Sequence, residues 1–238
     1  MLIDNLVSYW KFDESSGNAE DSHGANDLTN NGVATFGAGK INNATDLEAG
    51  SSQYFSIADA SQSGLDITGD LSVSMWVNFE TIPTATDYAY VVKKINGGRA
   101  YHWYQLDEGG TQKMVLELST DGSDSPSVNV AWTPSTATWY HVAFTFEAAT
   151  SEVKFFVDGS QQSTTQSIAA SSIFNGDGPF QVGAYFFNSA GGFFDGIIDE
   201  VGIWNRVLTA GEITSLYNGG NSLAYPLTTS PIWTIALI

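Results

Sequence analysis

The chain has 238 residues, of which 42% are hydrophobic and 13% are aromatic. Eight Lys and Arg residues stand against 26 Asp and Glu residues, which gives a formal net charge of −18. This balance excludes nucleic-acid binding, which needs a basic surface, and disfavours contact with anionic membranes. Cysteine is absent, which excludes disulfides, thiolate nucleophiles and cysteine-ligated zinc. The length is sufficient for a full core, and the abundant aromatic residues favour β structure.

The N-terminal region, residues 1–10, has no basic stretch followed by an apolar one, so no signal peptide is visible. No apolar run approaches the roughly 18 residues that a membrane-spanning helix requires. We therefore expect no membrane insertion.

Alternation of apolar and polar residues predicts a series of half-buried strands. The clearest strand is 71–79, and the segment 139–146 repeats its pattern. The other predicted strands are 6–12, 53–57, 89–95, 101–106, 113–118, 152–157, 180–183 and 196–204. Turn sequences such as Asp158-Gly159 separate many of them. The pattern predicts an all-β fold, a two-sheet antiparallel jelly-roll sandwich.

One short helix is predicted near the end of the chain. Thr209 and Glu212 have the spacing of a capping box, in which each side chain bonds to the other residue's backbone. Ile213, Leu216 and Tyr217 follow at helical spacing, and the sequence 218–220 (Asn-Gly-Gly) is expected to end the helix.

The segment after this helix has no charged residue. We divide the chain into a domain, residues 1–220, and an uncharged C-terminal tail, residues 221–238. The last seven residues, 232–238, are apolar and β-prone. They are expected either to form a final strand of the sandwich or to dock onto a partner.

Four stretches resemble the LamG-like jelly-roll domains of the concanavalin A-like lectin/glucanase superfamily. They are 6–17, 21–29, 138–144 and 193–213, and they occur in the order typical of that family. Two departures stand out. The loop 21–29 is one residue shorter than a common family version, and Gly202 replaces a residue that is often charged. We expect the second departure to change only a surface.

The resemblance implies a structural calcium ion that joins the loop after the first strand to the closing strand. Asp21, Asn26 and Asp199 would supply side-chain oxygens, with a backbone carbonyl near Gly24; oxygen is the ligand that Ca²⁺ prefers. Adjacent strand residues point to opposite faces, so we expect Asp199 but not Glu200 to face the site. The alternative is metal-free: Asp21 and Asn26 form Asx turns, and Asp199 accepts backbone hydrogen bonds.

A catalytic site is not expected. Asp195 and Asp199 share strand parity but are about 13 Å apart by strand rise, too far for either hydrolytic geometry. His141 lies on a strand, where a packed structural role is expected. We therefore predict that the protein is not an enzyme.

Aromatic residues beside small polar groups suggest a ligand surface. The candidates are Tyr101 and Trp103 on one strand and Tyr185, Phe187, Asn188 and Phe193 on the loop 185–194. The alternative for each aromatic side chain is packing in the core.

These observations favour a non-catalytic surface module that binds a carbohydrate or acts in adhesion, with a glycan or a surface protein as its partner. We expect it on an extracellular or virion surface. Two alternatives are kept: a virion structural protein (a phage fibre, receptor-binding or capsid decoration protein) whose tail joins a larger assembly, and a glycosidase.

Overall fold

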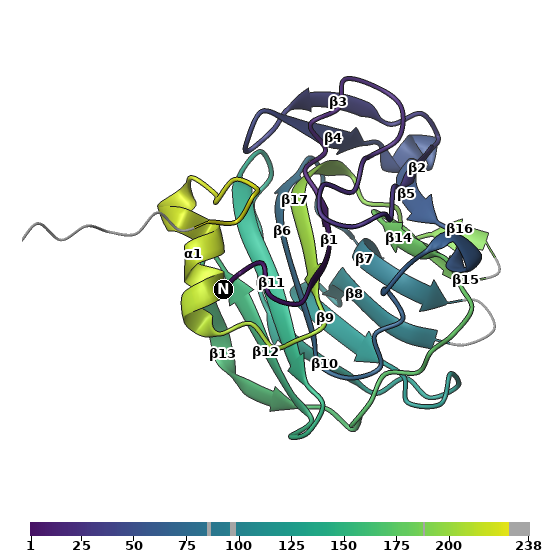
Figure 1. Ribbon diagram of the computed structural model, residues 1–238, viewed down its shortest axis with the longest axis vertical. Helices are drawn as coiled ribbons and strands as arrows, with labels where there is room; N and C mark the ends of the chain where they lie inside the picture. The colour runs from purple at the N-terminus through teal and green to yellow at the C-terminus, as the bar shows by residue number, and fades with distance from the viewer. Residues whose placement is uncertain (85–86, 96–98, 188, 229–238) are drawn as a thin grey trace, which may run out of the picture.

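The computed structural model describes residues 1–84, 87–95, 99–187 and 189–228, which form a sandwich of two twisted sheets (Figure 1). The first sheet has eight strands. They are, in order, β13 (Ser160–Ser167), β12 (Glu152–Val157), β11 (Trp139–Glu147), β6 (Leu71–Phe79), β17 (Gly196–Trp204), β4 (Asn43–Leu47) and β3 (Thr35–Ala38), with β1 (Leu6–Trp10) also paired to β17.

The second sheet has seven strands. They are, in order, β10 (Ser127–Ala131), β9 (Thr111–Leu118), β8 (Arg99–Glu108), β7 (Asp87–Ile95), β14 (Phe180–Val182), β5 (Tyr54–Ile57) and β2 (Thr29–Asn31). A small hairpin, β15 (Tyr185–Phe187) and β16 (Ser189–Gly191), contacts β7. Short 3₁₀ helices occupy Ala49–Ser51 (η1), Asp59–Ser61 (η2) and Asn218–Gly220 (η3). The predicted all-β jelly-roll sandwich is confirmed, and β6, β12 and β17 have the predicted boundaries.

The main core lies between the two sheets and follows the predicted alternation. Every second residue of β6, from Leu71 to Phe79, is fully buried there. Trp103 of the seven-stranded sheet meets Phe144 of the eight-stranded sheet edge to face, with ring centroids 5.1 Å apart.

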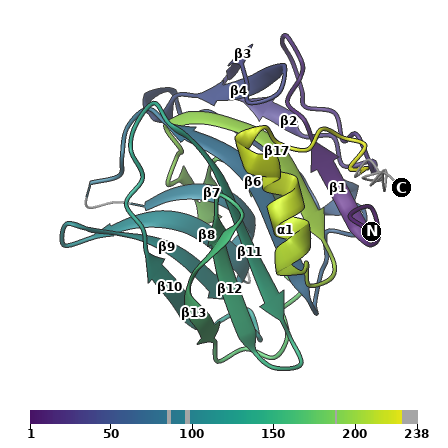
Figure 2. The ribbon, with the colours of Figure 1, turned by 90° about the vertical axis from the view of Figure 1, so that its left-hand side faces the viewer.

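A second core covers the outer face of the eight-stranded sheet. The helix α1 (Ala210–Tyr217) lies across this face in Figure 2 and buries Ile213 and Leu216 against Trp204 and Phe156. The predicted capping box of Thr209 and Glu212 is present at its start. No helix in the described ranges is long and apolar enough to span a membrane.

The second core also takes in both ends of the described chain. Leu2 and Leu227 are 5% and 4% exposed, and Leu223 and Tyr225 pack beside them. Part of the expected tail, up to residue 227, therefore contributes to this hydrophobic layer, and the domain boundary at residue 220 stays a prediction. Residues 229–238 lie outside the described residues.

Candidate functional site

A β-bulge in β17 determines where the acidic residues of the closing strand point. Asp199 pairs with Trp76, but the next pair is Gly202 with Ser74, so β17 has one extra residue here. Glu200 takes the extra place with φ of 51°. Ile198, Val201 and Ile203 face the main core. The expectation that Asp199 and Glu200 face opposite sides is therefore wrong, because the bulge interrupts the alternation.

Both carboxyl groups are buried, with exposures of 0% for Asp199 and 3% for Glu200. One oxygen of Asp199, Oδ2, accepts hydrogen bonds from the backbone N–H groups of Lys40 (2.7 Å) and Ile41 (3.1 Å). The other, Oδ1, has no hydrogen-bond partner in the described part of the chain. Glu200 accepts a short hydrogen bond from the Tyr9 hydroxyl.

These surroundings raise the pKa values of both carboxyl groups. Burial, followed by the charge of Glu200, raises the pKa of Asp199 to about 8. Burial raises the pKa of Glu200 to about 7, against the hydrogen bond from Tyr9, which lowers it. Among the described side chains, the charge of Lys11 lowers the pKa of Glu200, and no cation lowers that of Asp199.

The loop predicted to supply the other calcium ligands is held by its own hydrogen bonds. Asp21 accepts from the backbone N–H groups of Tyr9, His23, Gly24 and Asn26 at 2.9–3.0 Å, so both of its oxygens are engaged. The Asn26 side chain bonds to Ser8 and to both backbone groups of Ser63. A Cβ at Gly24 would lie 2.6 Å from Asp21 Oδ2, which explains the glycine.

The predicted calcium set therefore fits only in part. Asp21, Gly24 and Asn26 have the hydrogen bonds of the metal-free alternative, whereas Asp199 offers a buried oxygen that a cation could engage. Calcium itself stays a prediction.

A Cβ at Gly202 would lie 2.5 Å from the Trp204 ring, which belongs to the second core. The expectation that the departure at residue 202 changes only a surface is therefore wrong.

The Ser74 hydroxyl and His141 Nε2 are 2.8 Å apart, a distance that also occurs in nucleophilic sites. Here His141 is 1% exposed and its ring lies 6.2 Å from that of Tyr217 on α1. Burial lowers the pKa of His141 to about 3. The pair is enclosed in the second core, which agrees with the structural role expected for His141.

Two of the predicted ligand residues lie in the core. Tyr101 and Trp103 are 1% and 0% exposed and face the opposite sheet. They cannot contact a ligand on the surface, so their assignment is corrected. Strand β8 carries aromatic residues on both faces, and the outward face is the one of His102 and Tyr104.

The outward face of β8 forms an aromatic cluster with Tyr185 of the hairpin. The rings of His102 and Tyr104 stack with centroids 4.1 Å apart, and the Tyr185 ring lies 5.2 Å from His102. Tyr104 and Tyr185 are partly exposed. We call these three residues the aromatic cluster. Sequence reasoning missed Tyr104; the alternation across β8 and its neighbour β9 was the available signal.

The remaining predicted ligand residues are less well defined. Phe193 is partly exposed, and its ring lies 6.0 Å from that of Tyr54. Phe187 is described only as a strand residue of β15, and Asn188 lies outside the described residues. The structure thus groups Tyr185 with residues that were not predicted.

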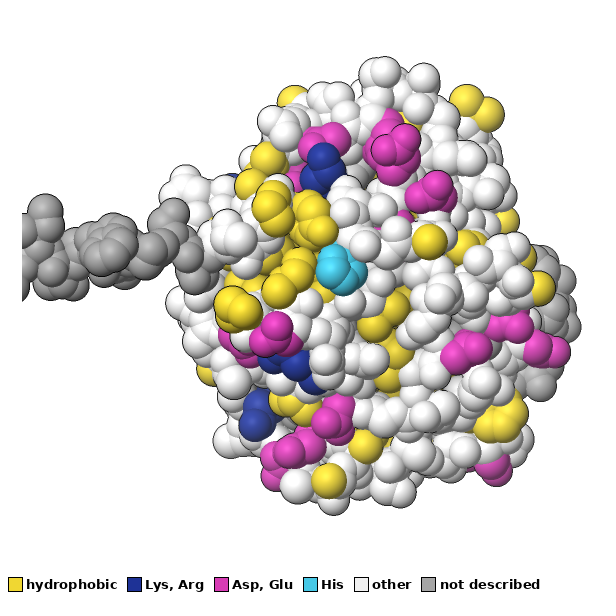
Figure 3. Space-filling view, in the orientation of Figure 1, with side chains coloured by type: hydrophobic (Ala, Val, Ile, Leu, Met, Phe, Trp, Pro, Cys, Tyr) yellow, Lys and Arg dark blue, Asp and Glu magenta, His cyan; other side chains and the backbone are white. Residues whose placement is uncertain are grey.

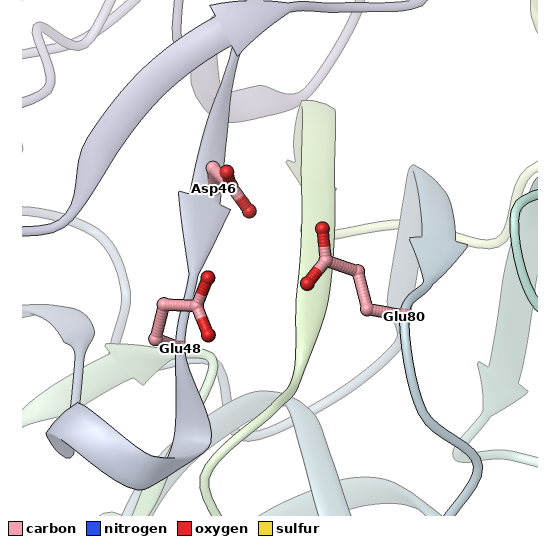
Figure 4. Close-up of side chains that lie close together, drawn as sticks. All are labelled: Asp46, Glu48 and Glu80. Carbon is pink, nitrogen blue, oxygen red and sulfur yellow. The ribbon is translucent and has the colours of Figure 1, made fainter.

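An acidic cluster that was not predicted lies on the outer face of the eight-stranded sheet. Carboxylate oxygens of Asp46, Glu48 and Glu80 lie within 4.8 Å of one another, and Figure 4 shows Asp46 and Glu48 on one segment with Glu80 across from them. Burial, together with the charge of Asp195, raises the pKa of Asp46. Asp46 lies on β4 and Glu48 follows its end, whereas Glu80 follows the end of β6, and β17 lies between these two strands. The pattern of β4 therefore shows two of the acids but not that the third lies beside them.

The fold and these surfaces define a lectin-like sandwich, and the sequence comparison identifies its family. Residues 49–214 match the family model of the concanavalin A-like lectin/glucanases superfamily. The chain belongs to this superfamily. A search of the curated proteins found no match.

Solved structures share the fold at low sequence identity. Domain 4 of AbnA, a GH43 extracellular arabinanase from Geobacillus stearothermophilus, in complex with arabinotriose, is 23% identical, with a TM-score of 0.63 over 88% of this chain and 97% of that one. The binding domain of Paraclostridial Mosquitocidal Protein 1 is 16% identical, with a TM-score of 0.71 over 92% of this chain. The binding domain of botulinum neurotoxin DC in complex with SialylT is 12% identical, with a TM-score of 0.69 over 92%. This chain matches 53% and 52% of those two toxin domains.

Proposed function

We propose that the protein is a non-catalytic carbohydrate-binding module that binds its ligand on the open face of the seven-stranded sheet. The observation that carries this proposal is the aromatic cluster of His102, Tyr104 and Tyr185. Aromatic faces beside a few well-placed polar groups are typical of small-molecule sites. The described residues place no helix over this face, whereas α1 covers the outer face of the other sheet.

Polar groups suited to sugar hydroxyls lie in the same rows of the sheet. His102 pairs with Glu117 on one side, and on the other side its row continues through β7 to Gln181 on β14. Gln181 is 1% exposed, and its Oε1 has no hydrogen-bond partner within the described ranges. Glu117 is partly exposed, so its carboxylate can accept a hydrogen bond from a sugar hydroxyl, whereas Gln181 lies below the surface of this face.

The comparisons support a binding role. The structures that share the fold include complexes with arabinotriose, with SialylT and with rat synaptotagmin II. A glycan or a surface protein is therefore the partner class we propose, at an extracellular or virion surface. The burial of Asp199 and Glu200 supports a non-catalytic role, because no substrate can reach them.

The test compares glycan binding by the wild-type protein with binding by Tyr104→Ala. On a neutral and sialylated glycan array we expect the variant to bind roughly tenfold more weakly, because it loses one stacking face. Tyr225→Ala is the matched control, since Tyr225 is a partly exposed tyrosine on the second core. Failure of the wild type to bind any glycan, or equal loss in both variants, contradicts the proposal.

One observation favours glycosidase activity as a second candidate. The oxygens of the acidic cluster are as close as the two carboxylates of a retaining glycosidase, about 5 Å. A hollow of about 350 Å³ that Glu80 helps to line lies beside it. Hydrolysis of a polysaccharide panel by the wild type but not by Glu80→Gln would replace the non-catalytic proposal.

A further inference from the structure

A hollow of about 380 Å³ opens at the end of the sandwich where β2 and β3 lie, at the top of Figure 1. We call it the end hollow. Its volume is within the range of small-molecule sites, about 300–1,000 Å³. It is lined by Ser15, Ser16, Gly17, Asn18, Asn30, Val33, Ala34, Thr35 and Phe36.

One asparagine holds the two walls of the end hollow together. Asn30 Nδ2 donates to the carbonyl oxygens of Gly17 (3.0 Å) and Ala34 (2.9 Å). Asn30 Oδ1 accepts from the N–H of Ala34 (2.8 Å), and the backbone N–H of Asn30 donates to Asn18 Oδ1 (3.1 Å). These hydrogen bonds hold the walls of the end hollow in place before a ligand binds.

Val33 on its rim has a conformation and an exposure that stability alone does not favour. Its side chain is 82% exposed, and its φ is 60°, a region that β-branched residues rarely occupy. Strained residues of this kind concentrate at ligand sites, where the surrounding structure holds them in place. Together with the partly exposed Phe36, Val33 gives the hollow an apolar patch.

The rest of the lining is polar but carries no charge. The hydroxyls of Ser15, Ser16 and Thr35 and the amide of Asn18 can donate and accept hydrogen bonds. None of the nine lining residues is charged, although the chain has 26 acidic residues. A charged ligand would therefore lose hydration without gaining an ionic partner in the hollow.

We propose that the end hollow is a second carbohydrate site, which takes one uncharged sugar unit. The apolar patch faces the C–H groups of the ring, and the hydroxyls and amide bond to its hydroxyl groups. This inference rests on the proposed carbohydrate-binding function but not on the aromatic cluster, because the two sites lie on different parts of the sandwich.

Amide chemical shifts measured by NMR separate the two sites. The probes are arabinotriose, galactose, N-acetylglucosamine and sialyllactose. At least one uncharged probe should shift the amides of residues 15–18 and 30–36. The charged sialic acid unit of sialyllactose should cause no further shift at these positions. Shifts confined to residues 102–106 and 113–117 overturn the end hollow while leaving the proposed function intact. No shift at either place, with any probe, overturns both.

Val33→Asn provides the variant test, because Asn tolerates positive φ and lacks the branched apolar surface. The variant should melt at the same temperature as the wild type or higher, and its affinity for the uncharged probe should fall at least fivefold. Tyr104→Ala is the matched control and should leave the shifts at the end hollow unchanged. Unchanged affinity in Val33→Asn overturns the inference.

Discussion

Glu200 shows how one backbone angle changes the chemistry of a strand. Its φ of 51° turns a continuous strand into a bulge and brings two carboxyl groups to the same side of the sheet. The residue types alone did not reveal this, because the sequence 196–204 does not show where its pairing with β6 shifts by one residue. Asp199 could be predicted as a buried acid from its apolar neighbours, but its partner could not.

The raised pKa values of this pair predict a stability that depends on pH. The unfolded carboxyls titrate near pH 4, about 3.9 for Asp and 4.3 for Glu, whereas Asp199 and Glu200 titrate at about 8 and about 7 in the fold. Between about pH 4 and pH 8 the folded chain therefore binds more protons than the unfolded chain. The contribution of this pair to the free energy of unfolding is highest near the acid end of this window and is lost as the pH rises through 7 and 8.

Thermal melts in EDTA between pH 5 and pH 9 test this prediction. The melting temperature of the wild type should fall across the range, and Asp199→Asn should reduce the fall, because its amide does not ionise. A fall of the same size in both proteins contradicts the assignment to Asp199. Lys11→Met controls for the neighbouring charge and should steepen the fall, since Lys11 lowers the pKa of Glu200.

Among the elements, helix α1 is the one that the sequence predicts best. Its start depends on a local exchange of hydrogen bonds: the N–H of Glu212 donates to Thr209 Oγ1 at 3.2 Å, and the N–H of Thr209 donates to Glu212 Oε2 at 2.9 Å. Arg206 adds two hydrogen bonds to the same carboxylate. Such contacts within a few residues are visible in a sequence.

Thr209→Ala should lower the free energy of unfolding by about 1 kcal/mol through loss of the cap. Urea denaturation measures it. Ser215→Ala is the matched control in the same helix, because its hydroxyl bonds only to the carbonyl of Gly211 one turn earlier, at 2.8 Å. The control should be neutral or slightly stabilising. Equal stabilities of Thr209→Ala and the wild type contradict the role of the cap.

Strands with strict alternation were predicted to within a few residues, and the others were missed for physical reasons. The edge strand β13 (Ser160–Ser167) consists of Ser, Gln and Thr and buries no apolar face. Polar edge strands of this kind discourage pairing with other chains. In β8 the opposite problem arises: aromatic residues stand on both faces, so the pattern did not show which face is outward.

At the scale of the molecule, calcium is the remaining test of the predicted site. An ion that binds only the folded chain raises its stability by RT ln(1 + [L]/Kd). We expect 1 mM CaCl₂ to raise the melting temperature at pH 8, where the acid pair ionises, and Asp199→Asn to remove the rise. A rise that survives in Asp199→Asn excludes this position, and no rise in the wild type excludes the calcium.

The two ends of the described chain meet on one side of the molecule. A hollow of about 290 Å³ lies between residues 1–3 and 226–228, and Figure 3 shows hydrophobic side chains gathered around this region. The predicted docking role of the tail concerns residues beyond this point. Because Leu227 is part of the second core, a deletion that tests this role should begin at residue 229.

The separation of the two outer faces determines which face stays accessible when the protein is attached through its N-terminus. Residues 1–3 and the last described residues lie on the helix-covered side, while the aromatic cluster lies on the opposite sheet. A sensor chip, a fusion partner or a neighbouring domain attached through the N-terminus therefore sits behind the sandwich. The outer face of the seven-stranded sheet then points away from the attachment point, as access to the proposed carbohydrate site requires.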